Sequence, residues 1–148
     1  MAERPKLDLT KYDFSTPEAR VLSFAQILEE DLYIQGSNRL RNQDGTFCCL
    51  GVGCDIFAQV NDCEWTKDGP EDNTPWFFGD EQEFFPESVS LWFGLKGQNP
   101  DMSNEAVRTV VEDWRYDTGT SMVSLNDDFN FTFKQIAAIL RANANATT

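Results

Sequence analysis

The chain has 148 residues, 41% of them hydrophobic, which is enough for one domain around a single core. Its 25 acidic and 12 basic residues give a formal net charge of −13, which repels nucleic acids and anionic membranes at long range. The chain also lacks an apolar run of membrane-spanning length and the apolar core of a secretion signal. We therefore expect one cytoplasmic domain (residues 1–148) with flexible ends at 1–15 and 142–148, and neither a nucleic acid nor a membrane as partner.

The first predicted helix starts at Thr16, whose hydroxyl can cap it, followed by Pro17 at the first helical position. Apolar residues then recur at helical spacing until Gly36. This pattern predicts an amphipathic helix packed on the core. After it, Asp44-Gly45 closes the polar segment NRLRNQDG and predicts a tight turn.

The second predicted helix, residues 47–60, is apolar on nearly all sides, and only Gly51, Asp55 and Gln59 interrupt it. A helix of this kind belongs at the centre of the fold. Burial of Asp55 then requires a cation or hydrogen-bond donors, and the nearest cations in sequence are Arg39 and Arg41. We expect Asp55 to be structural, with one of these arginines as its partner.

The rest of the chain gives less regular patterns. Residues 61–85 combine acidic residues with six aromatic ones and no period, which predicts a long irregular functional loop. Residues 86–95 predict a short helix, and 106–116 fit either a helix or a strand that turns at Asp117-Thr118-Gly119. Thr132 and Gln135 form a capping box that begins the last helix. Together these elements predict an α+β fold, with helices around the central helix at about 47–60 and a small hairpin or sheet.

Catalytic and metal-binding motifs are missing from the sequence. Without histidine the chain lacks the commonest general base and metal ligand, although its many carboxylates leave acid–base pairs open. Cys48, Cys49, Cys54 and Cys63 do not have zinc-knuckle spacing, and we expect buried thiols. The glycines of LGVGCD match neither dinucleotide-binding nor phosphate-loop patterns and indicate close packing. We predict a protein that is not an enzyme, with no catalytic residue, metal or cofactor.

A binding site is suggested by polar residues that flank the apolar elements. Arginines can grip phosphate or carboxylate through bidentate hydrogen bonds, and aromatic residues of the long loop can stack on a base. The alternative is an internal network of ion pairs and caps, and the sequence favours neither. The predicted ligand-binding residues are Arg39, Arg41, Tyr33, Gln35, Trp76, Trp92, Asn126 and Asp127.

An ordered series of motifs resembles a family of small phage and prophage proteins. That family carries an FCCLGVLCDL-like motif, a W-L-G-L segment and an LND…TF..IA ending, and the resemblance spans roughly residues 24–141. The matching residues here are Tyr33-Ile34-Gln35-Gly36, Leu40-Arg41, the run Phe47 to Asp55, Phe85-Pro86, Val89, Trp92, Gly94, Leu95, Asn99-Pro100, Leu125-Asn126-Asp127, Phe133, Ile136 and Ala137. Gly53 replaces the family's commoner leucine.

The resemblance implies an accessory protein that acts inside an infected bacterium and counters host defence. We expect it to sequester a nucleotide-derived immune signal, such as a cyclic nucleotide or an ADP-ribose-type molecule, without cleaving it. The alternative is an acidic decoy that mimics DNA and binds a defence protein. A carboxylate- or metal-dependent nucleotide hydrolase and a homo-oligomer both remain open.

Overall fold

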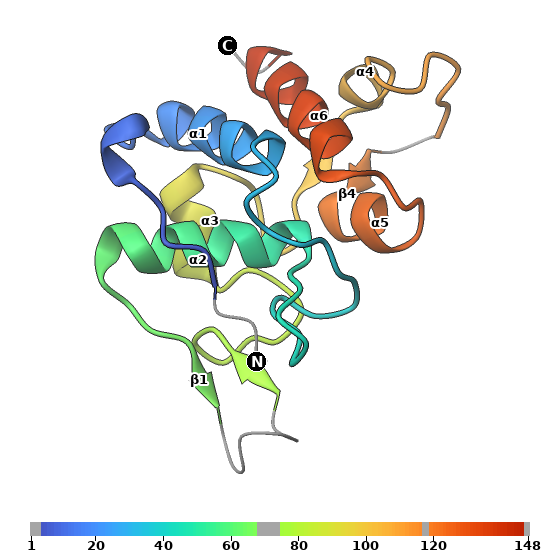
Figure 1. Ribbon diagram of the computed structural model, residues 1–148. Coiled ribbons are helices and arrows are strands. Elements are labelled where there is room, and N and C mark those ends of the chain that lie inside the picture. Colours follow the sequence, from blue (N-terminus) through green and yellow to red (C-terminus); the bar gives the residue numbers. More distant parts are fainter. Residues whose placement is uncertain (1–3, 68–74, 117–118, 147–148) are drawn as a thin grey trace.

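The computed structural model describes residues 4–67, 75–116 and 119–146. Two antiparallel sheets of two short strands each accompany six α-helices in these residues, so the fold class is α+β, as predicted (Figure 1). The 3-10 helix η1 spans Leu9–Lys11. The helices are α1 (Pro17–Glu29), α2 (Cys49–Asn61), α3 (Glu87–Phe93), α4 (Asn104–Val107), α5 (Met122–Asp127) and α6 (Phe133–Ala146). Strand β1 (Thr66–Lys67) pairs with β2 (Trp76–Phe77), and β3 (Asp101–Met102) pairs with β4 (Thr120–Ser121).

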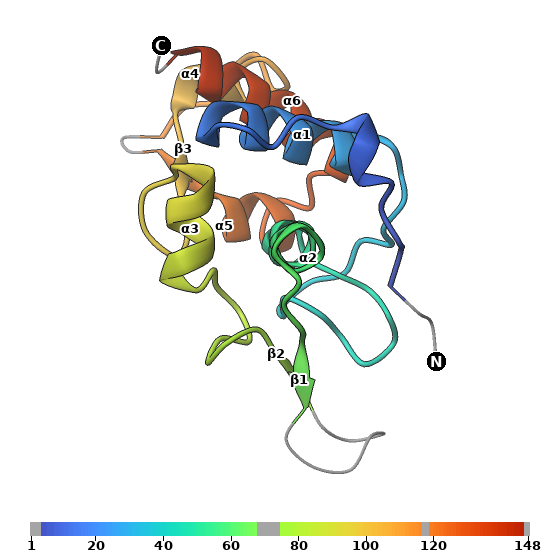
Figure 2. The same cartoon turned by 90° about the vertical axis from the view of Figure 1, so that its left-hand side faces the viewer.

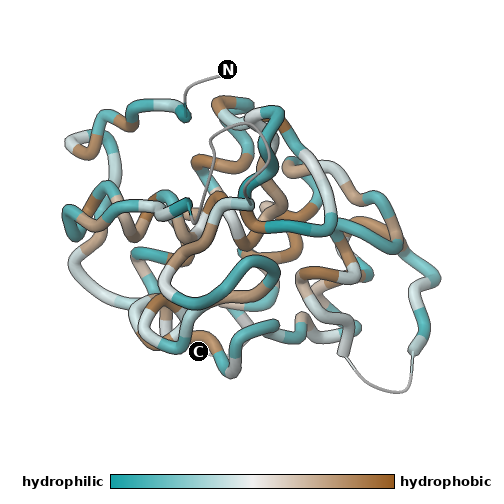
Figure 3. The backbone as a smooth tube through the Cα atoms, turned by 90° about the horizontal axis from the view of Figure 1, so that it is seen from below, coloured by the Kyte–Doolittle hydropathy of each residue, from teal (hydrophilic) through white to brown (hydrophobic). Residues whose placement is uncertain are grey.

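Helix α2 lies at the centre of the molecule, as its apolar surface predicts. Figure 2 looks along α2, with α1 and α6 on one side of it and the β1–β2 hairpin on the other. Helices α1 and α6 make the most extensive contact between any two described elements. Hydrophobic positions accordingly gather towards the interior of the backbone tube in Figure 3, where many outer loops are hydrophilic.

Two glycines let other elements approach α2 closely. A Cβ atom on Gly51 would lie 1.7 Å from the carbonyl oxygen of Leu40, and one on Gly53 would lie 2.8 Å from the ring of Phe85. The close-packing interpretation of LGVGCD is therefore confirmed. Gly53 thus provides the space that the Phe85 ring occupies.

Local sequence signals place the helix starts correctly. The Thr16 hydroxyl accepts a hydrogen bond from the Ala19 amide, at 3.1 Å, directly before α1. Before α6, the Thr132 hydroxyl accepts from the Gln135 amide and the Gln135 side chain accepts from the Thr132 amide, at 3.2 and 2.8 Å. Both caps satisfy amides that have no partner inside the helix.

Helix α1 ends earlier than its apolar pattern predicts. It stops at Glu29, and Asp31 takes a left-handed backbone conformation with φ of 62°. This turn leaves Leu32 exposed, although its spacing assigned it to the buried face of the helix. The predicted turn at Asp44-Gly45 is present, with Gly45 at φ 89°.

Two segments without a clear period contain short elements that the sequence did not locate. The irregular stretch 61–85 contains the β1–β2 hairpin, although residues 68–74 lie outside the described part. Residues 106–116 form neither a continuous helix nor a strand, because α4 ends at Val107 and turns follow. There the Arg108 side chain donates to the Trp114 carbonyl at 2.8 Å and closes the loop. Of the turn predicted after this segment, Asp117 and Thr118 are outside the described residues.

Each of the two predicted flexible ends contains helical residues where it is described. The N-terminal segment from Arg4 crosses α2 and forms η1, with Leu7 buried. At the other end, α6 continues to Ala146. Within the described residues, no helix has both the length and the apolar character to span a membrane.

Candidate functional site

Gly51, Asp55 and Gln59 form the one polar line along α2, and the carboxylate of Asp55 at its centre is fully buried. Its Oδ1 accepts hydrogen bonds from Arg4 Nη1 at 2.7 Å and from Trp65 Nε1 at 2.9 Å. Its Oδ2 accepts from the Tyr33 hydroxyl at 2.5 Å and from Gln59 Nε2 at 2.9 Å. Four donors therefore compensate for the loss of hydration of one carboxylate.

The prediction that Arg39 or Arg41 pairs with Asp55 is wrong, because Arg4 is the ion-pair partner. The N-terminal segment lies along α2 at this position and is held there by Gln59. Gln59 accepts from the Leu7 amide and donates to the Pro5 carbonyl, each at 2.9 Å. The segment thereby brings the Arg4 guanidinium to the polar line of the helix.

Arg41 lies beside this network and stacks on aromatic rings. Its guanidinium carbon is 3.7 Å from the centre of the Trp76 ring, and 5.7 and 5.6 Å from those of Phe47 and Trp65. Burial lowers the pKa of Arg41, and the nearby Arg4 charge lowers it further, against the opposing effect of Asp55. Among the described residues, neither a carboxylate nor a hydrogen-bond acceptor engages this guanidinium. Arg41 is thus a half-buried cation without an anionic partner among the residues that the structure describes.

Two adjoining pockets share Arg41 as a common wall. The first, of about 560 Å³, is lined by Arg4, Pro5, Lys6, Leu7, Leu9, Arg41 and Gln59. The second, of about 470 Å³, is lined by Arg39, Arg41, Asn42, Gln43, Asp44 and Pro75. Four of the chain's 12 basic residues line these two pockets. We call Arg4, Lys6, Arg39, Arg41 and Trp76 the arginine face.

Arg39 is exposed at the edge of the arginine face, where its side chain donates to Gln82. The Leu40 amide donates to the Gln82 carbonyl at 2.7 Å, so the backbone holds this loop independently of the Arg39 side chain. Three of the predicted ligand-binding residues, namely Arg39, Arg41 and Trp76, therefore lie together at one surface.

Tyr33 and Trp92 lie elsewhere and contact the core. The Tyr33 hydroxyl is held by Asp55, and burial followed by the Asp55 charge raises the pKa of this phenol. Trp92 packs against the rings of Phe14 and Phe57, and the Arg20 guanidinium lies 4.8 Å from its centre. Both side chains support the fold in this arrangement.

Gln35, Asn126 and Asp127 form the internal network that the sequence left open as an alternative. Gln35 Nε2 donates to Asn126 Oδ1 at 2.9 Å, and Asn126 Nδ2 donates to the Gly36 carbonyl at 2.8 Å and to Asp127 Oδ1 at 2.7 Å. The Asn38 amide donates to Asp127 Oδ2 at 3.1 Å. These bonds attach the loop that carries Arg39 and Arg41 to α5.

Sequence reasoning missed Arg4, Lys6 and Trp65. The first two belong to a segment with no apolar period, and Trp65 belongs to the stretch interpreted as an irregular loop. The one signal in the sequence was Asp55, because a buried carboxylate requires hydrogen-bond donors. The sequence did not show which residues supply them. The three residues become neighbours only because the N-terminal segment and the β1–β2 hairpin both lie against α2.

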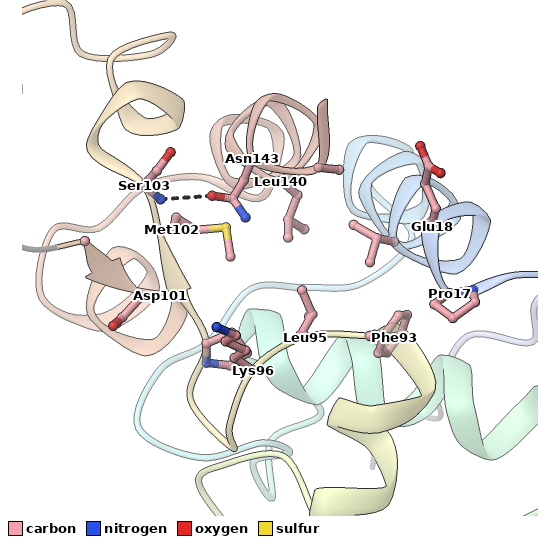
Figure 4. Close-up of a pocket in the computed structure, with 15 residues that line it drawn as sticks. Pro17, Glu18, Phe93, Leu95, Lys96, Asp101, Met102, Ser103, Leu140 and Asn143 are labelled. Carbon is pink, nitrogen blue, oxygen red and sulfur yellow. Dashed lines mark hydrogen bonds between the residues drawn. The ribbon is translucent and has the colours of Figure 1, made fainter. Parts of the chain in front are cut away.

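Another pocket, of about 600 Å³, lies between α1, α6 and the segment from Phe93 to Ser103 (Figure 4). Side chains such as Phe93, Leu95, Met102 and Leu140 make most of its wall apolar. Lys96 is the only basic residue in its lining, against the carboxylates of Glu18 and Asp101. This lining suits a small apolar molecule better than an anion, so we place the candidate site at the arginine face.

The thiols and carboxylates do not assemble a reactive or metal-binding group in the described part of the chain. Burial raises the pKa of Cys48 to about 12 and raises those of Cys49 and Cys54. All four cysteines are free thiols. Clusters of three or more His, Cys, Asp or Glu side chains that could hold a metal are not found among the residues described.

The chain matches a family model described as a domain of unknown function, DUF8296, over residues 23–144. Because the match covers most of the 148 residues, the chain belongs to the DUF8296 family. Neither curated proteins nor solved structures gave a match. Function must therefore be inferred from the geometry of the site.

Proposed function

We propose that this member of the DUF8296 family binds a nucleotide-derived anion at the arginine face and sequesters it without cleaving it. The observation that carries the proposal is Arg41, a half-buried guanidinium stacked on Trp76 with no acceptor among the described residues. A cation that has lost part of its hydration gains more from an anionic ligand than a fully hydrated cation does. Lys67 Nζ lies 4.5 Å from the centre of the same ring and adds a second cation there.

The stacked arrangement favours arginine over lysine at this position. A guanidinium can lie flat on an indole ring and still donate from its edge to two oxygens of a phosphate. An ammonium group is a hydrated point charge and offers no such planar fork. The residue type and its stacking therefore both fit recognition of a phosphoryl group next to an aromatic surface.

The resemblance to small phage proteins supports a narrower proposal about the ligand. A phage protein that holds a cyclic nucleotide or an ADP-ribose-type signal would prevent it from activating host defence. The ligand can be identified by denaturing the purified protein and analysing the released small molecules by mass spectrometry. Incubation of that ligand with the protein and magnesium or manganese should leave it intact, and conversion would indicate a hydrolase instead.

Calorimetry with a panel of cyclic nucleotides and ADP-ribose derivatives tests the binding proposal. Because charge-assisted hydrogen bonds contribute about 1.5–3 kcal/mol, Arg41→Ala should weaken binding roughly 10- to 150-fold. Arg41→Lys should recover only part of that loss. Arg115→Ala is the matched control, since Arg115 is exposed and its replacement removes the same charge elsewhere. No heat with any ligand, or equal affinity of Arg41→Ala and wild type, would refute the proposal.

A second candidate is the acidic decoy, which the ion-pair pattern favours. Of the carboxylates in the described part of the chain, only Asp55 and Glu29 are in ion pairs, with Arg4 and Arg141. The other described carboxylates make no ion pair within the chain and can face a basic partner. Such binding should weaken steeply as salt rises. Low-salt pull-downs from bacterial lysate that recover no basic or nucleic-acid-binding protein would refute this candidate.

A further inference from the structure

The position of Arg41 between two pockets distinguishes the arginine face from a site for a single phosphate. The first pocket has Arg4 and Lys6 in its wall, the second has Arg39, and Arg41 belongs to both. Arg41 therefore contributes to the lining of two separate pockets, and each pocket is lined by at least one further cation.

The charge balance of the two pockets is unequal but positive in both. The described lining of the first pocket contains Arg4, Lys6 and Arg41 and no carboxylate. Arg4 also forms an ion pair with the buried Asp55. Asp44 is the one carboxylate in the lining of the second pocket. Its Oδ1 is occupied by the amide and hydroxyl of Thr46, at 3.0 and 2.7 Å. Counted over the described residues, basic side chains therefore outnumber carboxylates in the lining of both pockets.

Hydrogen-bond capacity is also available on both sides. A guanidinium has five N–H donors, and those of Arg41 are unused by the described residues. Arg4 spends one nitrogen on Asp55 and Arg39 spends one on Gln82, so each retains further donors. Lys6 is exposed and adds an ammonium group. These donors can serve two separate phosphoryl groups, one in each pocket. A single phosphoryl group would leave the donors of the other pocket unused.

We propose that the ligand carries two phosphoryl groups, one in each pocket, with the Arg41 guanidinium between them. This inference rests on the proposed function and narrows the ligand to a dinucleotide or a nucleoside diphosphate derivative. A nucleoside monophosphate can fill only one of the two pockets. The Trp76 ring, which lies 3.7 Å from the Arg41 guanidinium carbon and 4.5 Å from Lys67 Nζ, holds two cations beside this site.

Calorimetry with adenosine monophosphate, ADP-ribose and a cyclic dinucleotide tests the inference on the full chain. At least one ligand with two phosphoryl groups should bind 10-fold or more tightly than the monophosphate, since each additional charge-assisted contact is worth roughly that factor. Lys6→Ala and Arg39→Ala should each weaken that ligand about 10-fold. Only one of the two substitutions should affect the monophosphate. Both residues are exposed, so unchanged melting temperatures should verify that the variants fold.

Exposed cations outside the arginine face provide the controls, and Lys134→Ala and Arg115→Ala should leave all affinities unchanged. If the monophosphate binds as tightly as the two-phosphoryl ligands and requires Arg41, the two-group inference is wrong while the proposed function stands. The two-group inference is also wrong if a single substitution, Lys6→Ala or Arg39→Ala, weakens every ligand and the other weakens none. If none of the three ligands binds, both the inference and the proposed function fail.

Discussion

Replacement of Asp55 by alanine tests whether the centre of the network is a structural residue. The change removes the acceptor of four hydrogen bonds and leaves Tyr33 and Trp65 with buried donors that have no partner. Each unsatisfied buried donor costs about 1–3 kcal/mol. Loss of the Arg4 ion pair adds little to this cost, because the Arg4 side chain is 33% exposed and can be hydrated instead. The expected loss in the free energy of unfolding is therefore about 3–5 kcal/mol, the usual cost of breaking a buried pair.

That loss is large against the roughly 5–15 kcal/mol that holds a domain of this kind folded. For a chain of this length it should lower the melting temperature by roughly 6–20 °C or prevent soluble expression. Asp55→Asn should lose less, since one oxygen of the amide still accepts while its nitrogen faces two donors. Urea denaturation followed by tryptophan fluorescence measures both variants.

Asp113→Ala removes an exposed carboxylate and serves as the control, with an expected change within about 0.5 kcal/mol. An Asp55→Ala protein that unfolds at the wild-type urea concentration would contradict the reasoning. If that protein also fails to bind ligand, Asp55 belongs to the binding site and its four bonds serve function instead of stability.

Four further predictions concern the scaffold around this network and its thiols. Gly51→Ala should prevent folding or cost more than about 3 kcal/mol by urea denaturation, because its Cβ would lie 1.7 Å from a backbone oxygen that cannot move aside. Asn126→Ala should cost about 2–4 kcal/mol by the same assay, because it breaks two hydrogen bonds to the loop that precedes α2 and one from the Cys49 amide at the start of α2. A loss below about 1 kcal/mol would contradict this. Burial raises the pKa of Cys48 from 9.0 to about 12, so the folded chain keeps protons that the unfolded chain has lost, and stability should fall as pH rises from 9 towards 12. At pH 8, Cys63 should be the one thiol of the folded protein that reacts rapidly with a disulfide reagent, and rapid reaction of all four would refute this assignment.

The parts of the fold that the sequence predicted depend on residues close together in the chain. The caps at Thr16 and Thr132 act on amides three residues away, and the buried position of α2 follows from its own apolar surface. The predicted turn at Asp44-Gly45 is equally local. Each of these features is settled by the geometry of a few consecutive residues, so periodicity and capping rules suffice.

The ion pair shows where such reasoning stops. Arg41 is 14 positions from Asp55 and Arg4 is 51 positions away, yet the distant residue is the partner. The outcome depends on the path of the N-terminal segment across α2, which Gln59 fixes through hydrogen bonds to the backbone. Burial of Asp55 was predictable from its helix, whereas the donor that reaches it was decided by tertiary packing.

The identity of the ion-pair partner of Asp55 matters for the proposed site. Had Arg41 paired with Asp55, part of its charge and of its hydrogen-bond donors would be used inside the protein. Because Arg4 takes that role, Arg41 is left against Trp76 with its donors free of the described residues. The same buried carboxylate also positions Trp65, which lies 5.6 Å from the Arg41 guanidinium carbon. The network around Asp55 thus supports the proposed binding surface and leaves Arg41 out of its ion pair.

An anion site in a chain of net charge −13 should respond to salt differently from a surface decoy. At physiological ionic strength, charges more than about 8 Å apart are largely screened, so salt mainly weakens the repulsion between ligand and distant carboxylates. The contacts at Arg41 are short and partly desolvated, and salt affects them less. Affinity for a two-phosphoryl nucleotide should therefore change by less than about threefold between roughly 50 and 200 mM salt, as measured by calorimetry. A decoy that binds a basic partner should lose affinity by orders of magnitude over the same range. A similarly steep loss for the nucleotide would mean that diffuse charge, and not the stacked Arg41, supplies the binding energy.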